Sequence, residues 1–337
     1  ANADTADDAT TARRFGAEGI GLCRTEHQFL GARLPDIRRM ILAGSPEEEE
    51  AALEVLEQFQ KEDYVELLEA MDGLPVTVRL LDPPLHEFLP DLEELVVAHA
   101  AGELDLTGQE LLVVTRQWQE RNPMLGTRGV RLGILRHGLY HMQVRALLQA
   151  AVTRREAGGD PQVEIMVPLI VERREFDLVR TWIDAEIAQV NAELDRPLDV
   201  LVGTMVETPR AALRAADLAE ASDFFSFGTN DLTQMTFGFS RDDVESRIIR
   251  EYLVLGLLPA NPFKSIDVEG VGQLVARAAA EGRRVNATLK LGVCGEHGGD
   301  PASIEFCYRA GLDYVSCSPF RVPVARLAAA QAVLAAR

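Results

Sequence analysis

The sequence predicts an α/β fold, a (β/α)8 barrel of the TIM type with helical insertions. Three observations support this prediction: short apolar runs recur along the chain, helix-like stretches separate them, and polar residues stand where the runs end. Alternation of strand and helix favours a parallel sheet covered on both faces. With 337 residues, 47% of them hydrophobic, the chain can bury a large core.

Seven runs rich in Val, Ile, Leu and Phe are predicted to form strands. In chain order they are GIGLCRTE (19–26), VTVRLLDPP (76–84), VEIMVPLI (163–170), VLVGTMVETP (200–209), FFSFGTND (224–231), LKLGVCGE (289–296) and DYVSCSP (313–319). A closed barrel of this type needs an eighth strand. The one gap of suitable size predicts a short strand near residues 129–134, the third along the chain.

One long helix is predicted over residues 45–71. Ser45 can cap it, Pro46 suits its first position, and the acidic run from Glu47 to Glu50 meets the positive end of the helix dipole. We therefore interpret the acidic run as part of a helix and not as a binding tail. Neither low-complexity segments nor repeats divide the chain, so we expect a single barrel domain over residues 1–337.

The formal net charge of -19 disfavours nucleic acid and anionic membranes as partners. The four cysteines follow no CxxC spacing, and we interpret them as reduced thiols of a cytoplasmic protein, without a zinc site or a disulfide framework. Apolar runs fall short of the roughly 18 residues that a membrane span needs. Because the sequence starts at Ala1 and not at methionine, we expect a fragment of a longer chain or a processed chain.

Polar residues at the predicted carboxyl ends of the strands form a candidate site, since active sites of such barrels lie there. Glu207 and Asp231 offer hard oxygen ligands for a divalent cation such as Mg²⁺. Arg24 and Arg79 can bind phosphate or carboxylate through two hydrogen bonds each. Two alternatives remain open: the acids can be helix caps, and Arg24 can pair locally with Glu26.

Other polar groups are less specific. Asn230, in the GTND turn, can bind a ligand or cap the helix that begins near Leu232. His137 and His141 lie four residues apart on a predicted helix without the glutamate of a zinc protease motif, and we interpret them as a structural pair. The sequence contains no GxxxxGK[ST], GxGxxG or GxSxG motif, which weighs against a nucleotide-binding or serine hydrolase domain.

Six segments together resemble the C-terminal phosphoenolpyruvate/pyruvate-binding domain of the pyruvate, phosphate dikinase family of PEP-utilising enzymes. They are GIGLCRTEHQF, VRLLDPPLHEFLP, NPMLGTRGVRLGI, GTMVETPRA, SFGTNDLTQMTFGFSRDD and GVCGEHGGDP, and they match in order over nearly the whole chain. Phosphoenolpyruvate synthase and enzyme I of the sugar phosphotransferase system share this barrel. LDPPLHEF and CGEHGGDP resemble the dikinase versions.

The resemblance implies roles for four arginines. Arg24 and Arg79 match the arginines that hold the phosphoryl group of the substrate, and Arg128 in GTRG matches a third that faces the same site. Arg241, in FSRDD, matches an arginine near the phosphoryl group in the enzyme I branch. A site with this many arginines is suited to a phosphorylated anion.

The resemblance also implies the Mg²⁺ site and the carboxylate-binding turn. Glu207 and Asp231 match the magnesium ligands of the family. Gly228, Thr229 and Asn230 match the turn that contacts the carboxylate of the substrate. The expected cofactor is therefore Mg²⁺, and the expected substrates are phosphoenolpyruvate and pyruvate.

Cys294 matches the proton donor of the family. Loss of the phosphoryl group from phosphoenolpyruvate leaves pyruvate enolate, which must be protonated at carbon 3. A thiol with a reference pKa of about 8.5 can give or take this proton when its surroundings adjust it. Cys23, Cys307 and Cys317 are better interpreted as small buried hydrophobic residues, because each lies within a strand or helix pattern.

The resemblance implies partners that the sequence does not contain. The phosphohistidine carrier motif and the ATP-grasp domain of the family are absent from these 337 residues, so we expect only the pyruvate half-reaction. A homodimer is expected by resemblance as well. The alternatives are the same half-reaction in a relative of phosphoenolpyruvate synthase or enzyme I, a Mg²⁺-dependent pyruvate-enolate aldolase or lyase, and a binding module without turnover of its own.

Overall fold

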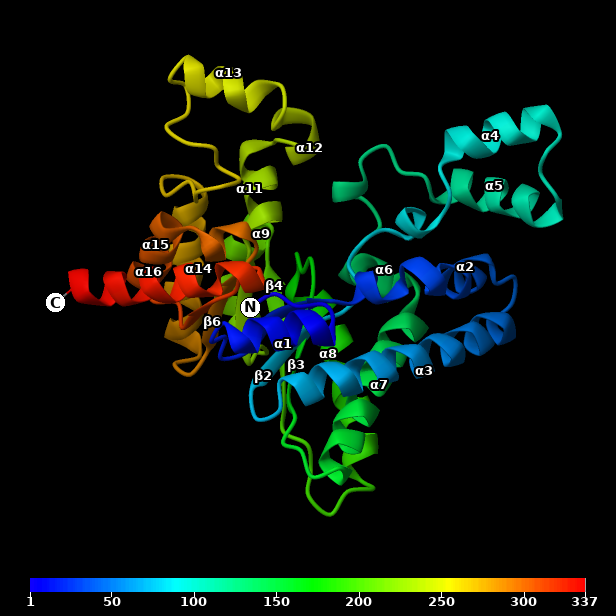
Figure 1. Ribbon diagram of the computed structural model, residues 1–337, viewed down its shortest axis with the longest axis horizontal. Helices are drawn as coiled ribbons and strands as arrows, with labels where there is room; N and C mark the ends of the chain where they lie inside the picture. The colour runs from blue at the N-terminus through cyan, green and yellow to red at the C-terminus, as the bar shows by residue number, and fades with distance from the viewer. Residues whose placement is uncertain (337) are drawn as a thin grey trace.

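The computed structural model describes residues 1–336, and in this range a parallel sheet of seven strands forms a nearly closed barrel (Figure 1). Each strand pairs with the next one along the chain. The strands are β1 Ile20–Arg24, β2 Pro75–Arg79, β3 Gln162–Val167, β4 Val200–Val206, β5 Phe224–Gly228, β6 Lys290–Cys294 and β7 Tyr314–Val315. All seven predicted runs contain a strand, and the predicted fold class is confirmed.

The predicted strand near residues 129–134 is wrong. Residues Val130–Leu135 form helix α6, and β2 pairs directly with β3. Gly129 has a φ of 55°, a left-handed backbone conformation that glycine adopts more easily than other residues. Its N–H donates to the carbonyl oxygen of Asp82 at 2.7 Å. This turn directs the chain into a helix, whose buried residues Val130, Leu132 and Gly133 follow helical spacing.

The gap between β7 and β1 is bridged by the first residues of the chain. The N–H of Asn2 donates to Cys317 O at 2.7 Å, just beyond β7, and the N–H of Ala3 donates to Leu22 O at 3.1 Å in β1. Asn2 also forms a parallel bridge with Leu22. Residues 1–3 therefore bridge the barrel between β7 and β1, and not between β2 and β3, where the eighth strand was predicted.

The predicted long helix is confirmed as α3, Pro46–Ala70. The N–H of Glu48 donates to Ser45 Oγ at 3.2 Å, as expected for a capping serine. α3 packs against α7, His137–Glu156 (Figure 1). Other helices around the barrel are α1 Ala6–Arg14, α2 Leu34–Leu42, α8 Arg173–Asn191, α9 Pro209–Leu213, α10 Ala215–Ala219, α11 Thr229–Phe237, α14 Val271–Val285, α15 Pro301–Arg309 and α16 Val322–Ala335.

Two helical insertions project from the barrel. One contains α4 Leu92–Ala101 and α5 Leu106–Trp118, and the other contains α12 Arg241–Val244 and α13 Ile248–Val254. They extend upward as two separate arms in Figure 1. The predicted helical insertions are thus present. None of the helices within residues 1–336 combines the length and the apolar character that crossing a membrane requires.

Candidate active site

A cavity of about 930 Å³ lies at the carboxyl ends of the strands. Its walls include Asp82, Arg128 and Asp231 from the barrel, and His86 and Asp242 from the segments that lead into the two insertions. The walls combine these charged groups with apolar residues such as Leu125, Met235 and Phe239, as is usual for a ligand-binding cavity. Three of the predicted site residues, Arg128, Asn230 and Asp231, line this cavity. Its described lining does not include the others, which are Arg24, Arg79, Glu207, Gly228, Thr229, Arg241 and Cys294.

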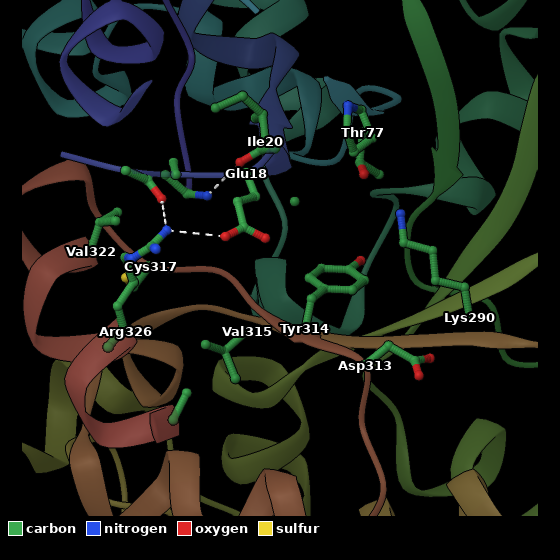
Figure 2. Close-up of a pocket in the computed structure, with 18 residues that line it drawn as sticks. Glu18, Ile20, Thr77, Lys290, Asp313, Tyr314, Val315, Cys317, Val322 and Arg326 are labelled. Atoms are coloured by element: carbon green, nitrogen blue, oxygen red, sulfur yellow. Dashed lines mark hydrogen bonds and ion pairs between the residues drawn. The ribbon is translucent and has the colours of Figure 1, made fainter. Parts of the chain in front are cut away.

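A second cavity, of about 500 Å³, lies at the opposite, amino ends of the strands (Figure 2). Lys290 and Tyr314 line it at the starts of β6 and β7, and Lys290 Nζ donates to Glu164 Oε1 at 2.5 Å. Arg326 Nη1 pairs with Glu18 at the rim, at 3.1 Å. None of the predicted site residues lines this cavity, so we place the candidate site at the carboxyl ends.

Arg79 and Arg128 belong to one buried network of ion pairs. Arg79 ends β2, pairs with Glu26 and lies 3.1 Å from Asp82 Oδ2 through its Nη1. Arg128 Nη2 donates to the same Asp82 oxygen at 2.6 Å, and its Nη1 donates to Asp231 Oδ1 at 3.1 Å. Burial opposes the ionisation of Asp82, but the charges of Arg79 and Arg128 outweigh it and lower its pKa.

Arg24 ends β1 and pairs with Asp4, not with Glu26. Its Nη2 lies 2.8 Å from Asp4 Oδ2, and its backbone N–H donates to Asp4 Oδ1 at 2.7 Å. The local pair with Glu26, which the sequence left open, does not form because Glu26 binds Arg79. The Arg24 side chain remains 39% exposed and can meet a ligand.

Glu207 and Asp231 follow β4 and β5. Leu169, whose φ of 57° is unusual for a residue with a side chain, donates its N–H to Glu207 Oε1 at 2.7 Å. Burial, followed by the negative charges of Asp231 and Asp82, raises the pKa of Glu207 well above its ordinary value. A cation bound near Glu207 would offset the repulsion among these carboxylates. The carboxylate oxygens of Glu207 and Asp231 are therefore suitable ligands for a divalent metal ion.

Two carboxylates can meet the ligand preference of Mg²⁺. Within residues 1–336, no group of three or more His, Cys, Asp or Glu side chains is arranged to hold a metal ion. Mg²⁺ is commonly held by one or two carboxylates and completes its coordination with water and substrate oxygens. Glu207 and Asp231 can supply this pair of carboxylates.

Gly228 makes room for Glu207. A Cβ atom on Gly228 would lie 2.5 Å from Glu207 Oε2 and 2.7 Å from Glu207 Cβ. We expect Gly228→Ala to displace Glu207 and to weaken Mg²⁺-dependent ligand binding about tenfold, as a cost of ~1.4 kcal/mol implies. Calorimetric titration measures this affinity, with oxalate, a small dicarboxylate, as the ligand and with Mg²⁺ present. Gly44→Ala, at an exposed position where the added Cβ would lie no closer than 3.5 Å to its nearest neighbour, serves as the control. Equal affinity in both variants would contradict the steric argument.

Thr229 and Asn230 begin α11 and make different contacts. Thr229 Oγ1 lies 2.7 Å from His297 Nδ1 and 3.5 Å from the carbonyl oxygen of Cys294, so it joins α11 to the end of β6. Asn230 lines the large cavity and accepts a hydrogen bond from Arg241 Nη1 at 3.0 Å. The structure therefore places Asn230, and not the Thr229 side chain, at the cavity wall.

Arg241 lies at the start of α12 and contacts the edge of the candidate site. It pairs with Glu245 at 3.0 Å and with Glu296 at 2.8 Å, in addition to Asn230. Glu296 follows Cys294 closely in the chain. Arg241 thus joins the second insertion to the loop after β6, whereas Arg79 and Arg128 share a separate network through Asp82.

Cys294 ends β6 as a buried thiol. Ser226 Oγ donates to Cys294 Sγ at 3.4 Å, and the cysteine packs with Met205 and Phe224 inside the barrel. Burial raises the pKa of the Cys294 thiol to about 11, with a smaller opposing effect of the Ser226 hydrogen bond. Cys23, Cys307 and Cys317 are buried too, as predicted.

The raised pKa predicts how fast Cys294 is alkylated. Because the thiolate is the reactive form, the rate with iodoacetamide should rise about tenfold per pH unit below the pKa and level off near pH 11. Mass spectrometry of the Cys294 peptide between pH 7 and pH 11 measures this. Levelling off near pH 8 would contradict the raised pKa. Ser226→Ala should slow alkylation further, because it removes a hydrogen bond that favours the thiolate.

Sequence reasoning did not single out Asp82, Asp4 or Ser226. Asp82 directly follows a predicted strand, in LLDPP, so its position could have identified it. Ser226 lies within a strand, and only the alternation of side chains would place it inside the barrel. Asp4 carries no local signal, because its contact with Arg24 depends on residues 1–3 lying beside β1.

A parallel barrel with arginines, paired carboxylates and a buried thiol at its carboxyl ends defines a domain suited to a small anion. Residues 1–334 match the family described as "PEP-utilising enzyme, PEP-binding domain", and the chain belongs to this family.

The chain is similar to three curated proteins named pyruvate, phosphate dikinase. It is 54% identical over 338 residues to that of Rhizobium meliloti (strain 1021), covering 100% of this chain and 37% of the relative. It is 52% identical over 338 residues to the chloroplastic protein of Flaveria trinervia, covering 99% and 35%. The protein of Clostridium symbiosum is 50% identical over 335 residues, covering 99% and 38%. The chain thus spans somewhat more than a third of these relatives.

Proposed function

We propose that the chain interconverts phosphoenolpyruvate and pyruvate, as the pyruvate half-reaction of a dikinase. The phosphoryl group would pass to or from a histidine on a carrier domain, in a Mg²⁺-dependent step. Cys294 would donate a proton to carbon 3 of the enolate, or remove one from pyruvate in the opposite direction. The family match and relatives named pyruvate, phosphate dikinase support the substrate class. A cytoplasmic location and a homodimer belong to the same proposal and rest on the sequence expectations alone.

One observation carries the proposal: the Cys294 thiol lies within the electrostatic reach of the charged groups at the strand ends. Glu207 raises the pKa of this thiol, while Arg79 and Arg24 lower it, after the larger effects of burial and of Ser226. In the sheet, Cys294 also pairs with Gly228, where an added Cβ would lie 2.5 Å from Glu207 Oε2. These neighbours support a shared site for an acid or base group and a candidate metal ligand.

The arginines account for binding and for phosphoryl transfer. Arg24, Arg79 and Arg128 would bind the oxygens of the phosphoryl group, and the amide of Asn230 would bind the carboxylate. The carrier nitrogen attacks phosphorus, the bond from phosphorus to the enol oxygen breaks, and its electron pair stays on that oxygen. A divalent cation held by Glu207 and Asp231 would supply positive charge for the enolate oxygen.

Cys294 would complete the reaction by protonation. The enolate electrons form a new bond from carbon 3 to the proton of the thiol, and the thiolate remains. In the opposite direction, the thiolate removes a proton from the methyl group of pyruvate and regenerates the enolate. A thiol with a pKa of about 11 is protonated at neutral pH, which suits the donor direction.

An aldolase or lyase acting on a pyruvate enolate is the second candidate, favoured by the buried thiol and the carboxylate pair. An enzyme of this kind would need no group that binds a phosphoryl moiety.

One experiment distinguishes the two candidates. It measures binding of phosphoenolpyruvate with Mg²⁺, together with cleavage of 4-hydroxy-2-oxo acids. We expect binding that Arg128→Ala abolishes, and no cleavage. Cleavage without binding of phosphoenolpyruvate would favour the lyase. The same half-reaction in a synthase or enzyme I relative remains the alternative within the phosphotransferases.

A further inference from the structure

Asp4 is a buried carboxylate beside the end of β1. It directly follows residues 1–3, which bridge β7 and β1, and precedes the capping residue Thr5 of helix α1. Only 8% of its side chain is exposed. A carboxylate this well buried is costly unless positive or hydrogen-bonding groups satisfy it.

Arg24 supplies most of the partners of Asp4. Asp4 Oδ2 accepts from Arg24 Nη2 at 2.8 Å and from Nε at 3.2 Å, while Oδ1 accepts from the Arg24 backbone N–H at 2.7 Å. His27 Nδ1 lies 2.8 Å from Oδ2. Asp4 thus binds the Nε and Nη2 edge of the guanidinium and also the main chain that carries it.

The edge of the Arg24 guanidinium that carries Nη1 can bind a ligand. Within residues 1–336, hydrogen bonds of the Arg24 side chain involve Nε and Nη2, and none involves Nη1. The guanidinium is planar, so holding one edge also orients the opposite one. Burial opposes the ionisation of Asp4, but hydrogen bonds from His27 and Arg24 outweigh it and lower its pKa.

We propose that Asp4 is a positioning residue, which orients Arg24 for the phosphoryl group of the substrate. This inference rests on the proposed function. A free arginine side chain would lose conformational entropy when it binds, whereas one already held by Asp4 loses little. The N-terminal segment therefore contributes to the site as well as to the closure of the barrel.

The test compares a ligand that carries a phosphoryl group with one that does not. Phosphoenolpyruvate and oxalate are titrated by calorimetry, with Mg²⁺, into the chain and its Asp4→Asn variant. We expect the affinity for phosphoenolpyruvate to fall about tenfold and that for oxalate to change less than about threefold. The control is Asp8→Asn, which changes an exposed carboxylate on the same segment that interacts with Thr5. An equal loss for both ligands, or no loss, would overturn the proposal.

A double-mutant cycle shows whether Asp4 acts through Arg24. In the Arg24→Ala background, Asp4→Asn should weaken phosphoenolpyruvate binding no further. If Asp4→Asn lowers the affinity for phosphoenolpyruvate about tenfold in that background as well, Asp4 does not act through Arg24. If the Asp4→Asn variant does not fold, the His27→Gln variant is titrated in its place. We expect its affinity to fall about threefold for phosphoenolpyruvate and to stay unchanged for oxalate. No such loss would count against the proposal.

A measurement without ligand separates this inference from the proposed function. The Nε–H proton of Arg24, assigned by its disappearance in Arg24→Ala, should give a protected NMR signal that Asp4→Ala removes, because alanine has no oxygen to accept from Nε. If the unmodified chain binds no phosphoenolpyruvate, the proposed function fails. A signal that persists in Asp4→Ala would instead show that Asp4 does not hold Arg24.

Discussion

Cys294→Ala should stop the exchange of the methyl protons of pyruvate with solvent. With pyruvate and Mg²⁺ in heavy water, we expect the chain to exchange these protons slowly and the variant to exchange them at least about 100-fold more slowly, as is typical when an acid or base group is lost. The physical reason is that Cys294 is proposed to move the proton at carbon 3, and alanine has no group that can accept or donate one. Proton NMR of the methyl signal measures the rate.

Two comparisons make this result specific to Cys294. Cys307→Ala removes another buried thiol, in α15, and should exchange at the rate of the unmodified chain. Oxalate affinity should remain within about threefold in Cys294→Ala, because a buried thiol of this pKa carries no charge. Undiminished exchange in Cys294→Ala would exclude the cysteine from the proton step.

Glu207→Gln and Asp231→Asn should each remove the Mg²⁺ dependence of oxalate binding. We expect an affinity loss of at least about tenfold at saturating Mg²⁺, because each variant replaces a charged oxygen ligand. Titrations with and without Mg²⁺ give both quantities. Glu186→Gln, which neutralises another buried carboxylate, paired with His141, is the matched control. Binding that stays equally Mg²⁺-dependent in both variants would refute the ligand assignment.

The pH dependence of this binding follows from Glu207. Its pKa is raised by burial and by the charges of Asp231 and Asp82, so protons occupy it at higher pH than an ordinary glutamate. Mg²⁺ must displace that proton, and its apparent affinity should therefore rise with pH until Glu207 is fully ionised. In Glu207→Gln this rise should disappear. An unchanged pH profile would show that another group controls it.

The sequence predicted the fold class and all seven strands because each apolar run is short and ends in a polar or special residue. The eighth strand was misplaced, since the apolar residues of 129–134 have helical spacing that continues into α7. At a different place in the barrel, beside β1, residues 1–3 form a short bridge. Three residues with no periodicity give no strand signal, so only the three-dimensional structure could reveal them.

The candidate site was predictable where residues follow strands. Glu207, Asp231 and Cys294 lie at consecutive strand ends. Position indicated the two acids, and the resemblance to the family indicated the role of Cys294. The pairing of charges was not predictable, because it depends on contacts between distant segments. Glu26 binds Arg79 and leaves Arg24 to Asp4, and Arg128 reaches both Asp82 and Asp231.

Transfer of a phosphoryl group to a histidine tests the central claim most directly. The chain is mixed with Mg²⁺, phosphoenolpyruvate and a separately produced, unphosphorylated histidine carrier domain from one of the dikinase relatives. The phosphorus NMR spectrum is followed for the phosphoryl group, and the proton NMR spectrum for the methyl group of pyruvate. We predict that the phosphoenolpyruvate signal declines while a phosphohistidine signal and an equal amount of pyruvate appear, and that Arg79→Ala prevents this. Phosphoenolpyruvate that binds but yields no phosphohistidine would contradict the proposed half-reaction.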